Sequence, residues 1–333
     1  MKSLMSIAPG GPETLVLQDV PDPVAGPGEL LIAIKACSVN FPDVLVIEDK
    51  YQFKPTRPFA PGNDISGVVE AVGEGVTKWK VGDRVLGSAS GSGGMAEKAV
   101  MAEGRAYALP KERSFAEGAS LLMTYGTTIH GLIDRADIKE GDVMLVLGAA
   151  GGVGMSAIEL GVAFGARVIA AVSSEEKAEA CRKIGAADVV IYPRGPLDRD
   201  QQKALSEAFK KAAGPEGYGI IYDIIGGDYA EPALRAIGWE GRYLVVGFTA
   251  GIPKLPLNLT LLKACDVRGV FWGAFTAREP ERNQDHIARL FRLWKEGKIA
   301  PLVSETFPLA RGGDAIAKMA RREAIGKLVV TMD

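Results

Sequence analysis

The alternation of apolar and polar residues divides the chain into two kinds of segment. Up to about residue 120, short apolar runs such as 30–37 and 65–72 are separated by glycine and proline, which is typical of short strands in a barrel-like β unit. Over 142–248, short apolar strands alternate with longer amphipathic segments, which predicts βαβ units. The expected fold class is therefore α/β, with a β-rich unit and a doubly wound parallel sheet.

The second kind of segment predicts its elements individually. Strands are expected at Val143–Leu147, Arg167–Val172, 188–192, 220–225 and 242–247, and helices at 175–184 and 201–212. After residue 256 the pattern predicts a strand at 267–272, an amphipathic helix at 285–295 and a last strand at Lys327–Thr331. This tail is a candidate to rejoin the β-rich unit.

Length and charge narrow the function classes. The 333 residues suffice for about two domains. The 39 Lys and Arg residues nearly balance the 41 Asp and Glu residues, which argues against a nucleic-acid partner or a charged membrane partner. The longest uncharged stretch, 143–158, is too short and too rich in glycine for a membrane-spanning helix.

Cysteine and histidine are scarce. The three Cys and two His lie far apart along the chain, which excludes a structural zinc cluster of four nearby cysteines and a disulfide framework. The N-terminal residues lack the basic and apolar regions of a signal peptide. A cytoplasmic protein is expected.

Among the 41 glycines, the informative ones lie in the sequence GAAGGVG at 148–154. This stretch follows an expected strand and opens an expected helix, which is the setting of a dinucleotide-binding turn. Its backbone can approach a pyrophosphate at the helix N-terminus. The expected cofactor contacts are Ala150, Gly151, Gly152 and Val153. The alternative is a turn that serves only helix–strand packing.

The end of the second strand indicates which dinucleotide binds. An NAD site usually has an acid there, about 20 residues after the turn, whereas this chain has Ser173 and Ser174, with Lys177 one helical turn further. These groups suit a 2′-phosphate and predict NADPH. Alternatively, Ser173 and Glu176 form a capping box and Lys177 is solvated. Both interpretations can hold together.

Several motifs together resemble one family. Gly141-Asp142, Leu145 and the stretch AAGGVG at 149–154 resemble the signature of the quinone oxidoreductase (zeta-crystallin-like) branch of the medium-chain dehydrogenase/reductases. VGDRV at 81–85, NFPD at 40–43 and GKL at 326–328 are also similar to it. Glu159 and Val162 depart from the pattern, because the family usually has glutamine and a basic residue there.

The resemblance implies a two-domain architecture and a homodimer. A GroES-like β-barrel domain would comprise 1–122 and 258–333, and a Rossmann NADP-binding domain would comprise 123–257. Relatives in the superfamily use zinc, but Asn40 aligns with their first zinc-binding cysteine and Gly62-Asn63-Asp64 aligns with their Gly-His-Glu. Since an amide replaces neither thiolate nor imidazole, no metal is expected.

Metal-free hydride transfer requires an acceptor that is already electrophilic. The leading hypothesis is an NADPH-dependent quinone oxidoreductase, and the alternative is a reductase of α,β-unsaturated carbonyls (enones, enals or acryloyl thioesters). A non-catalytic NADPH-binding structural or RNA-binding protein is a third class. The resemblance places Asn40 and Tyr51 at the nicotinamide, with Tyr51 as hydrogen-bond or proton donor. Otherwise Tyr51 is a loop aromatic, and Asn40 bonds only to its own loop.

The resemblance also implies further cofactor contacts. They are Thr127, His130, Tyr192, Gly247, Phe248, Phe271, Trp272, Gly273 and Arg322. His130 stands where the family often has an aromatic residue, which argues against its acting as a base. Phe248 would otherwise pack in the core, and 271–273 would otherwise belong to a buried dimer strand.

Overall fold

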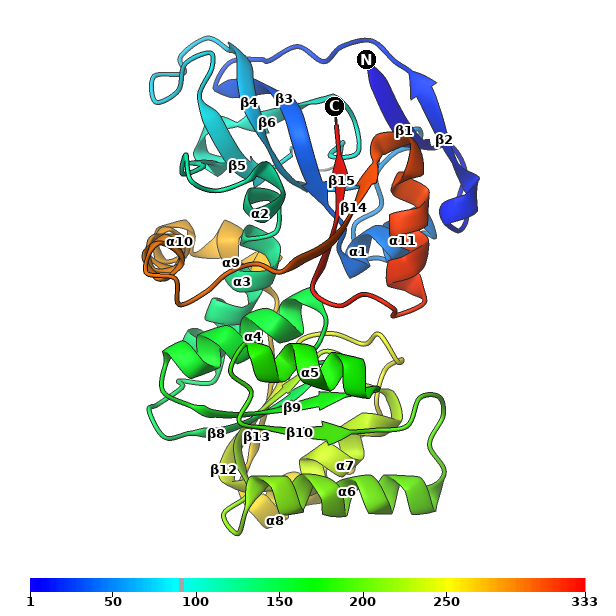
Figure 1. The fold of residues 1–333 in the computed structure, drawn as a ribbon, viewed down its shortest axis with the longest axis vertical. Coiled ribbons are helices and arrows are strands. Elements are labelled where there is room, and N and C mark those ends of the chain that lie inside the picture. Colours follow the sequence, from blue (N-terminus) through cyan, green and yellow to red (C-terminus); the bar gives the residue numbers. More distant parts are fainter. Residues whose placement is uncertain (90–92, 333) are drawn as a thin grey trace. The chain divides into compact units, whose positions relative to one another are not determined.

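The computed structural model describes residues 1–89 and 93–332. The chain forms two compact units (Figure 1). The first comprises Met1–Met123 and Pro301–Asp333, and the second comprises Thr124–Ala300. The chain therefore passes between the units twice, and both of its ends lie in the first unit.

The first unit is built mainly on antiparallel strands, as the short apolar runs predict. One sheet has the order β14-β15-β3-β4-β5-β7 with β6 paired to β3, and β1 and β2 form a second sheet. Its strands are β1 (Lys2–Ser6), β2 (Leu15–Asp19), β3 (Glu29–Ser38), β4 (Asp64–Val72), β5 (Arg84–Ser88), β6 (Lys98–Ala102), β7 (Ala106–Ala108), β14 (Val303–Pro308) and β15 (Lys327–Thr331). Its helices are α1 (Phe41–Ile47), α2 (Phe115–Ala119) and α11 (Gly312–Ala320).

The second unit is a parallel sheet between helices, which confirms the doubly wound fold. The strand order is β10-β9-β8-β11-β12-β13, and every pairing is parallel. The strands are β8 (Val143–Leu147), β9 (Arg167–Val172), β10 (Asp188–Ile191), β11 (Tyr218–Asp223), β12 (Ile237–Val245) and β13 (Asp266–Gly269). Figure 1 shows α4 (Gly152–Ala163) and α5 (Glu175–Lys183) on one face, and α6 (Arg199–Ala213) and α7 (Ala230–Arg235) on the other.

Residues 258–300 also belong to the second unit, which differs from the boundary expected at residue 257. The reason is β13, which continues the parallel sheet by pairing with β12 in the register Arg242↔Asp266. This segment also contains α8 (Asn258–Lys263), α9 (Trp272–Arg278) and α10 (Pro280–Lys295). The strand expected at 267–272 ends at Gly269, and Trp272 instead opens a helix.

Each unit has its own apolar core. In the first, Leu30, Ile32 and Ile34 alternate along β3 and are at most 2% exposed, because alternate side chains of a strand face the same side of a sheet. In the second, strands β8, β9 and β11 are buried between the two helical layers, so their apolar residues run almost continuously. None of the helices over residues 1–89 and 93–332 has the length and apolarity to span a membrane.

A buried lysine joins the two parts of the chain that make up the first unit. Lys327, at the start of β15, is only 3% exposed. Its Nζ donates to Oδ1 of Asn40 at 2.6 Å and to the carbonyl of Val39 at 3.0 Å. These groups lie 287 and 288 residues away in sequence. A buried ammonium needs such partners, because losing its hydration is costly without them.

Two buried carboxyl groups surround this lysine. Asp43 accepts from the backbone N–H of Asn40 at 2.7 Å, and Asp64 accepts from the Asn40 side-chain amide at 3.3 Å. Burial raises the pKa of Asp64 to about 7 and that of Asp43 to about 6, although the Lys327 charge opposes both shifts. Burial also lowers the pKa of Lys327. The charges of these three groups therefore depend on one another.

Lys327→Met should destabilise the protein more at about pH 8 than at about pH 5.5. The two carboxyl pKa values are raised in the folded state, so the stability they contribute at low pH is lost as pH rises towards 7. Without the lysine, ionised acids remain buried and uncompensated, at a cost of about 3–5 kcal/mol.

Urea unfolding at both pH values measures this difference. Adding Asp64→Asn to Lys327→Met should recover part of the loss at the higher pH. An equal loss at both pH values would show that the ammonium does not compensate these acids.

Candidate functional site

The glycine-rich turn lies between β8 and α4. Gly148 has φ +74°, which favours glycine. A Cβ at Gly154 would lie 2.4 Å from the carbonyl oxygen of Gly148, so only glycine fits where the helix meets the turn. Gly151, in contrast, has room for a Cβ, whose nearest contact would be 3.7 Å away. The turn therefore needs some of its glycines for close packing, as the alternative interpretation holds.

The N-terminus of α4 is also suited to an anion. Its N-cap is Gly151, and no side chain caps the helix. Because the first amides of a helix have no partner within it, an uncapped N-terminus favours a phosphate. Ala150 is buried, whereas Gly151, Gly152 and Val153 are half-buried. Packing and phosphate binding are thus compatible in this turn.

The end of β9 presents two serines with different surroundings. Ser174 is the N-cap of α5 and accepts from the backbone N–H of Lys177 at 3.4 Å. The capping box considered for Ser173 and Glu176 does not form, since the helix begins one residue later. Ser173 instead accepts from Nε of Arg194 at 3.3 Å. Ser173 is therefore not used as the helix cap.

Arg194 is a candidate that the sequence reasoning missed. It follows β10, which is paired with β9, so it lies near the same edge of the sheet as Ser173. The available signal was a basic residue just after the third expected strand. Lys177 is half-buried in the first turn of α5. The adjacent acid Glu175 forms an ion pair with Arg182, which offsets part of its unfavourable charge.

Two further predicted residues lie near the same end of the parallel sheet. Gly247 and Phe248 follow β12, and the backbone N–H of Gly247 donates to the Asp223 carbonyl at 3.2 Å. Phe248 is 45% exposed, which argues against a purely core role. Ligands of such sheets bind at the carboxyl ends of the strands.

Tyr192 follows β10 and is buried. Its ring lies 4.7 Å from that of Tyr229, centroid to centroid. The hydroxyl of Tyr229 donates to the carbonyls of Pro193 and Gly195 in the following loop. Tyr192 is thus packed beside the segment that carries Arg194, and its contact with a cofactor phosphate stays a prediction.

Thr127 and Trp272 belong to neighbouring elements of the second unit. Thr127 lies on α3 (Leu122–Ile129) and is half-buried. The Trp272 ring packs on the same helix, since a Cβ at Gly126 would lie 2.6 Å from it. Its Nε1 donates to Oδ1 of Asn283 at 3.0 Å. Phe271 directly precedes α9, and its side chain is 59% exposed. Gly273 lies in the first turn of that helix.

His130 is held within the second unit. Its Nδ1 lies 2.7 Å from Oδ2 of Asp134, and its ring stacks on Phe275 at 4.1 Å between centroids. Burial alone would raise the pKa of Asp134, but hydrogen bonds from His130 and His286 and the Arg282 charge hold that pKa well below its usual range. The ring therefore has a structural partner, and its contact with a cofactor stays a prediction.

In the first unit, Asn40 is fixed by the contacts with Lys327 and Asp64. Tyr51 follows α1 and is half-buried. Burial, and then the negative charge of Asp43, raise the pKa of Tyr51, so its hydroxyl keeps its proton at neutral pH. Arg322 lies after α11 with φ +58° and is exposed. Asp43 therefore acts on both predicted residues: it bonds to the backbone of Asn40, and its charge raises the pKa of Tyr51. No such link to Asp43 is described for Arg322.

The residues around Asn40 do not suit zinc. Asn40 Oδ1 accepts from the Lys327 ammonium, a cation that a metal would have to displace. Burial raises the pKa of Cys37 well above its usual value, which disfavours a thiolate ligand. Over residues 1–89 and 93–332, no group of three or more His, Cys, Asp or Glu side chains is arranged to hold a metal.

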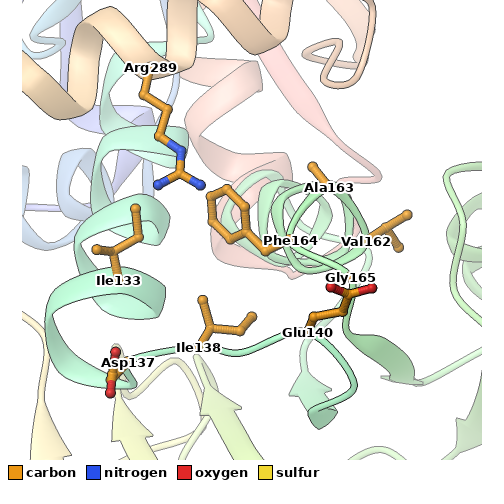
Figure 2. A pocket seen from close by; sticks show the side chains of 9 residues that line it. All are labelled: Ile133, Asp137, Ile138, Glu140, Val162, Ala163, Phe164, Gly165 and Arg289. Atoms are coloured by element: carbon orange, nitrogen blue, oxygen red, sulfur yellow. The ribbon is translucent and has the colours of Figure 1, made fainter.

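A hollow of about 540 Å³ elsewhere in the second unit is not part of this site. It is lined by Ile133, Asp137, Ile138, Glu140, Val162, Ala163, Phe164, Gly165 and Arg289. Figure 2 shows the Arg289 guanidinium beside the Phe164 ring, 4.5 Å from its centroid. Glu140 and Gly165 precede β8 and β9, so the hollow lies at the amino ends of these strands, away from the glycine-rich turn.

Comparisons with known proteins agree with this arrangement. The model of the alcohol dehydrogenase GroES-like domain matches residues 26–111, and that of the zinc-binding dehydrogenase family matches residues 152–289. A quinone oxidoreductase-like protein 2 homolog from Nematostella vectensis is 35% identical over 308 residues, covering 92% of this chain and 82% of that protein.

Solved structures agree over the whole chain. A mycobacterial protein complexed with NADPH has a TM-score of 0.89 at 29% identity, covering 99% of each chain. The CurK enoyl reductase has a TM-score of 0.86 at 25% identity, covering 100% of this chain and 99% of that one. The fold, the glycine-rich turn and these similarities show that the chain is an oxidoreductase of the quinone oxidoreductase branch of the medium-chain dehydrogenase/reductase superfamily.

Proposed function

We propose that this protein is an NADPH-dependent, zinc-independent reductase that transfers hydride to quinones. Two observations support the cofactor assignment: the N-terminus of α4 after β8 has no side-chain cap, and Arg194 bonds to Ser173 after β9. The quinone assignment is supported by the name of the Nematostella relative. The structure complexed with NADPH supports the same cofactor here.

Two groups of residues would hold the cofactor. The uncapped N-terminus of α4 and the glycine-rich turn would bind the pyrophosphate. Ser173, Lys177 and Arg194 would bind the 2′-phosphate, because a hydroxyl and two cations provide charge-assisted hydrogen bonds. Bound NADPH would supply the hydride.

The contacts of Asn40 support the proposed zinc independence. A zinc alcohol dehydrogenase polarises its substrate oxygen on the metal. In this protein a lysine ammonium occupies the hydrogen-bonding position of Asn40 Oδ1. A zinc-independent enzyme of this kind would need an acceptor that is electrophilic by itself, as quinones and conjugated carbonyls are.

Tyr51 is the group proposed to interact with the acceptor. Its hydroxyl is protonated at neutral pH, so it can donate a hydrogen bond to the acceptor oxygen, or a proton once hydride addition has made that oxygen basic. Asn40 would help to hold this end of the site, since its side chain is fixed on both sides by Lys327 and Asp64.

A second candidate function is the reduction of α,β-unsaturated carbonyls. The similarity to the CurK enoyl reductase over the full chain favours it, because both acceptors are planar conjugated electrophiles. Specificity constants with NADPH for quinones, enones, enals and acryloyl thioesters would order the two functions. A large preference for the carbonyl compounds would replace quinone reduction as the assignment, and no turnover on any acceptor would contradict both.

Lys177→Ala and Arg194→Ala should each weaken NADPH binding by ~1–3 kcal/mol and leave NADH binding nearly unchanged. The reason is that only NADPH carries the 2′-phosphate. Fluorescence titration of both nucleotides measures the difference. Lys183→Ala, at the other end of α5, is the control. Equal losses for the two nucleotides would show that these cations do not recognise the phosphate.

Tyr51→Phe should lower turnover by about a hundredfold and leave NADPH affinity nearly unchanged, because only the hydroxyl is lost. Steady-state kinetics with the preferred acceptor, together with nucleotide titration, test this expectation. Tyr107→Phe on β7 controls for the loss of a hydroxyl in the same unit. Unchanged turnover would leave Tyr51 without a catalytic role.

We also propose a homodimer formed along the edge of the parallel sheet. Strand β13 is the last strand in the sheet order, and Val267 on it is 39% exposed. Next to it in sequence, Leu261 and Leu262 of α8 are 79% and 62% exposed. An uncovered strand edge with exposed apolar residues favours pairing with another copy.

Leu261→Glu with Leu262→Glu should shift the protein from dimer to monomer, because two charges would enter an apolar interface. Sedimentation velocity measures the change. Val24→Glu, at a residue 85% exposed in the first unit, is the matched control. A wild-type monomer at micromolar concentration would contradict the dimer.

A further inference from the structure

Glu159 connects α4 to two other segments of the second unit. This residue lies on the helix whose N-terminus forms the candidate phosphate site. Its carboxylate accepts from the hydroxyl of Tyr125, and it accepts from the backbone N–H of Ala300 at 3.1 Å and 3.3 Å. Tyr125 is only 2% exposed, whereas Glu159 is half-buried.

The two partners of Glu159 are next to the two points where the chain passes between the units. The first passage lies between Met123 and Thr124, within α3, and Tyr125 is on that helix. The second lies between Ala300 and Pro301, so Ala300 is the last residue of the second unit. A single carboxylate therefore binds both connections to α4.

The surroundings of Glu159 make its protonation sensitive to pH. Burial raises its pKa to about 7, although the hydrogen bonds from Tyr125 and Ala300 oppose the shift. Burial, and then the Glu159 charge, raise the pKa of Tyr125 well above its ordinary value, so Tyr125 stays a donor.

Within the part of the chain that the structure describes, the groups that hydrogen-bond to Glu159 carry no positive charge. From α3 it meets the phenol of Tyr125, and from the segment after α10 it meets a backbone amide. Over residues 1–89 and 93–332, no ammonium or guanidinium group forms an ion pair or hydrogen bond with it. The Arg289 guanidinium on α10 stacks instead on Phe164, at the end of α4.

Ionisation changes the strength of these contacts. The carboxylate accepts both donors in charge-assisted hydrogen bonds, which are about twice as strong as neutral ones. The neutral acid keeps an acceptor for Ala300, but its own proton competes with the Tyr125 hydroxyl. A glutamine at this position would resemble the neutral acid and could not change charge.

We propose that Glu159 is a positioning residue, a proton-controlled clasp that holds both inter-unit connections to α4 when it is ionised and loosens them when it is protonated. The catalytic consequence rests on the proposed function, because α4 would carry the cofactor pyrophosphate. The clasp itself can be measured without turnover.

Hydrogen–deuterium exchange at Ala300 tests the clasp directly. After correction for intrinsic exchange, Ala300 should be protected about fivefold more at about pH 8.5 than at about pH 6 in the wild-type protein. Glu159→Gln should show the same protection at both pH values. Tyr125→Phe should move the transition to higher pH, because it removes a hydrogen bond that favours the ionised form. Glu179→Gln on α5 controls for the loss of one acid.

If exchange at Ala300 has the same pH dependence in the wild type and in Glu159→Gln, the proposed clasp does not exist. The pH profile of kcat/KM for NADPH adds a second readout, in which Glu159→Gln should reduce the step near pH 7, to which Asp43 and Asp64 also contribute. A pH-dependent protection that Glu159→Gln abolishes supports the clasp even if no acceptor is reduced. In that case only the proposed function fails.

Discussion

The first unit depends on one requirement, that a buried ammonium must have its hydrogen bonds satisfied. Lys327 begins β15. Its partner Val39 follows directly after β3, and its partner Asn40 is the N-cap of α1. Two segments of the chain, separated by nearly 290 residues in sequence, are therefore held together by a few short contacts. Moving β15 out of register would leave the ammonium and the acids around it buried without partners.

The same requirement determines the chemistry available at Asn40. The amide oxygen accepts from the lysine and the amide nitrogen donates to Asp64, so this side chain is committed to an internal network. Zinc is bound by thiolate, imidazole or carboxylate groups, whereas the amide of Asn40 is bonded to an ammonium and to one carboxyl group. The proposed hydride transfer needs polar groups that hold the acceptor in place, and Asn40 is a polar group whose position is fixed.

Buried acids recur in both units, but their partners differ. Asp64 and Asp43 share a lysine, so each influences the ionisation of the others. Among the described residues, the hydrogen-bond donors to Glu159 are a phenol and a backbone amide. The difference follows from burial with and without a compensating cation. The protonation of both sites changes with pH, but only in the first does a lysine charge oppose the effect of burial.

The sequence alone determined the features that depend on local pattern. Hydrophobic periodicity predicted the parallel sheet, including the bounds of β8, β9 and β15, and the glycine-rich turn predicted the nucleotide fold. Tertiary structure decided what depends on contacts between distant segments. It placed β13 in the second sheet, brought Arg194 to Ser173 and joined Lys327 to Asn40. These pairings involve residues far apart along the chain, and such contacts have no period or spacing from which they could be read.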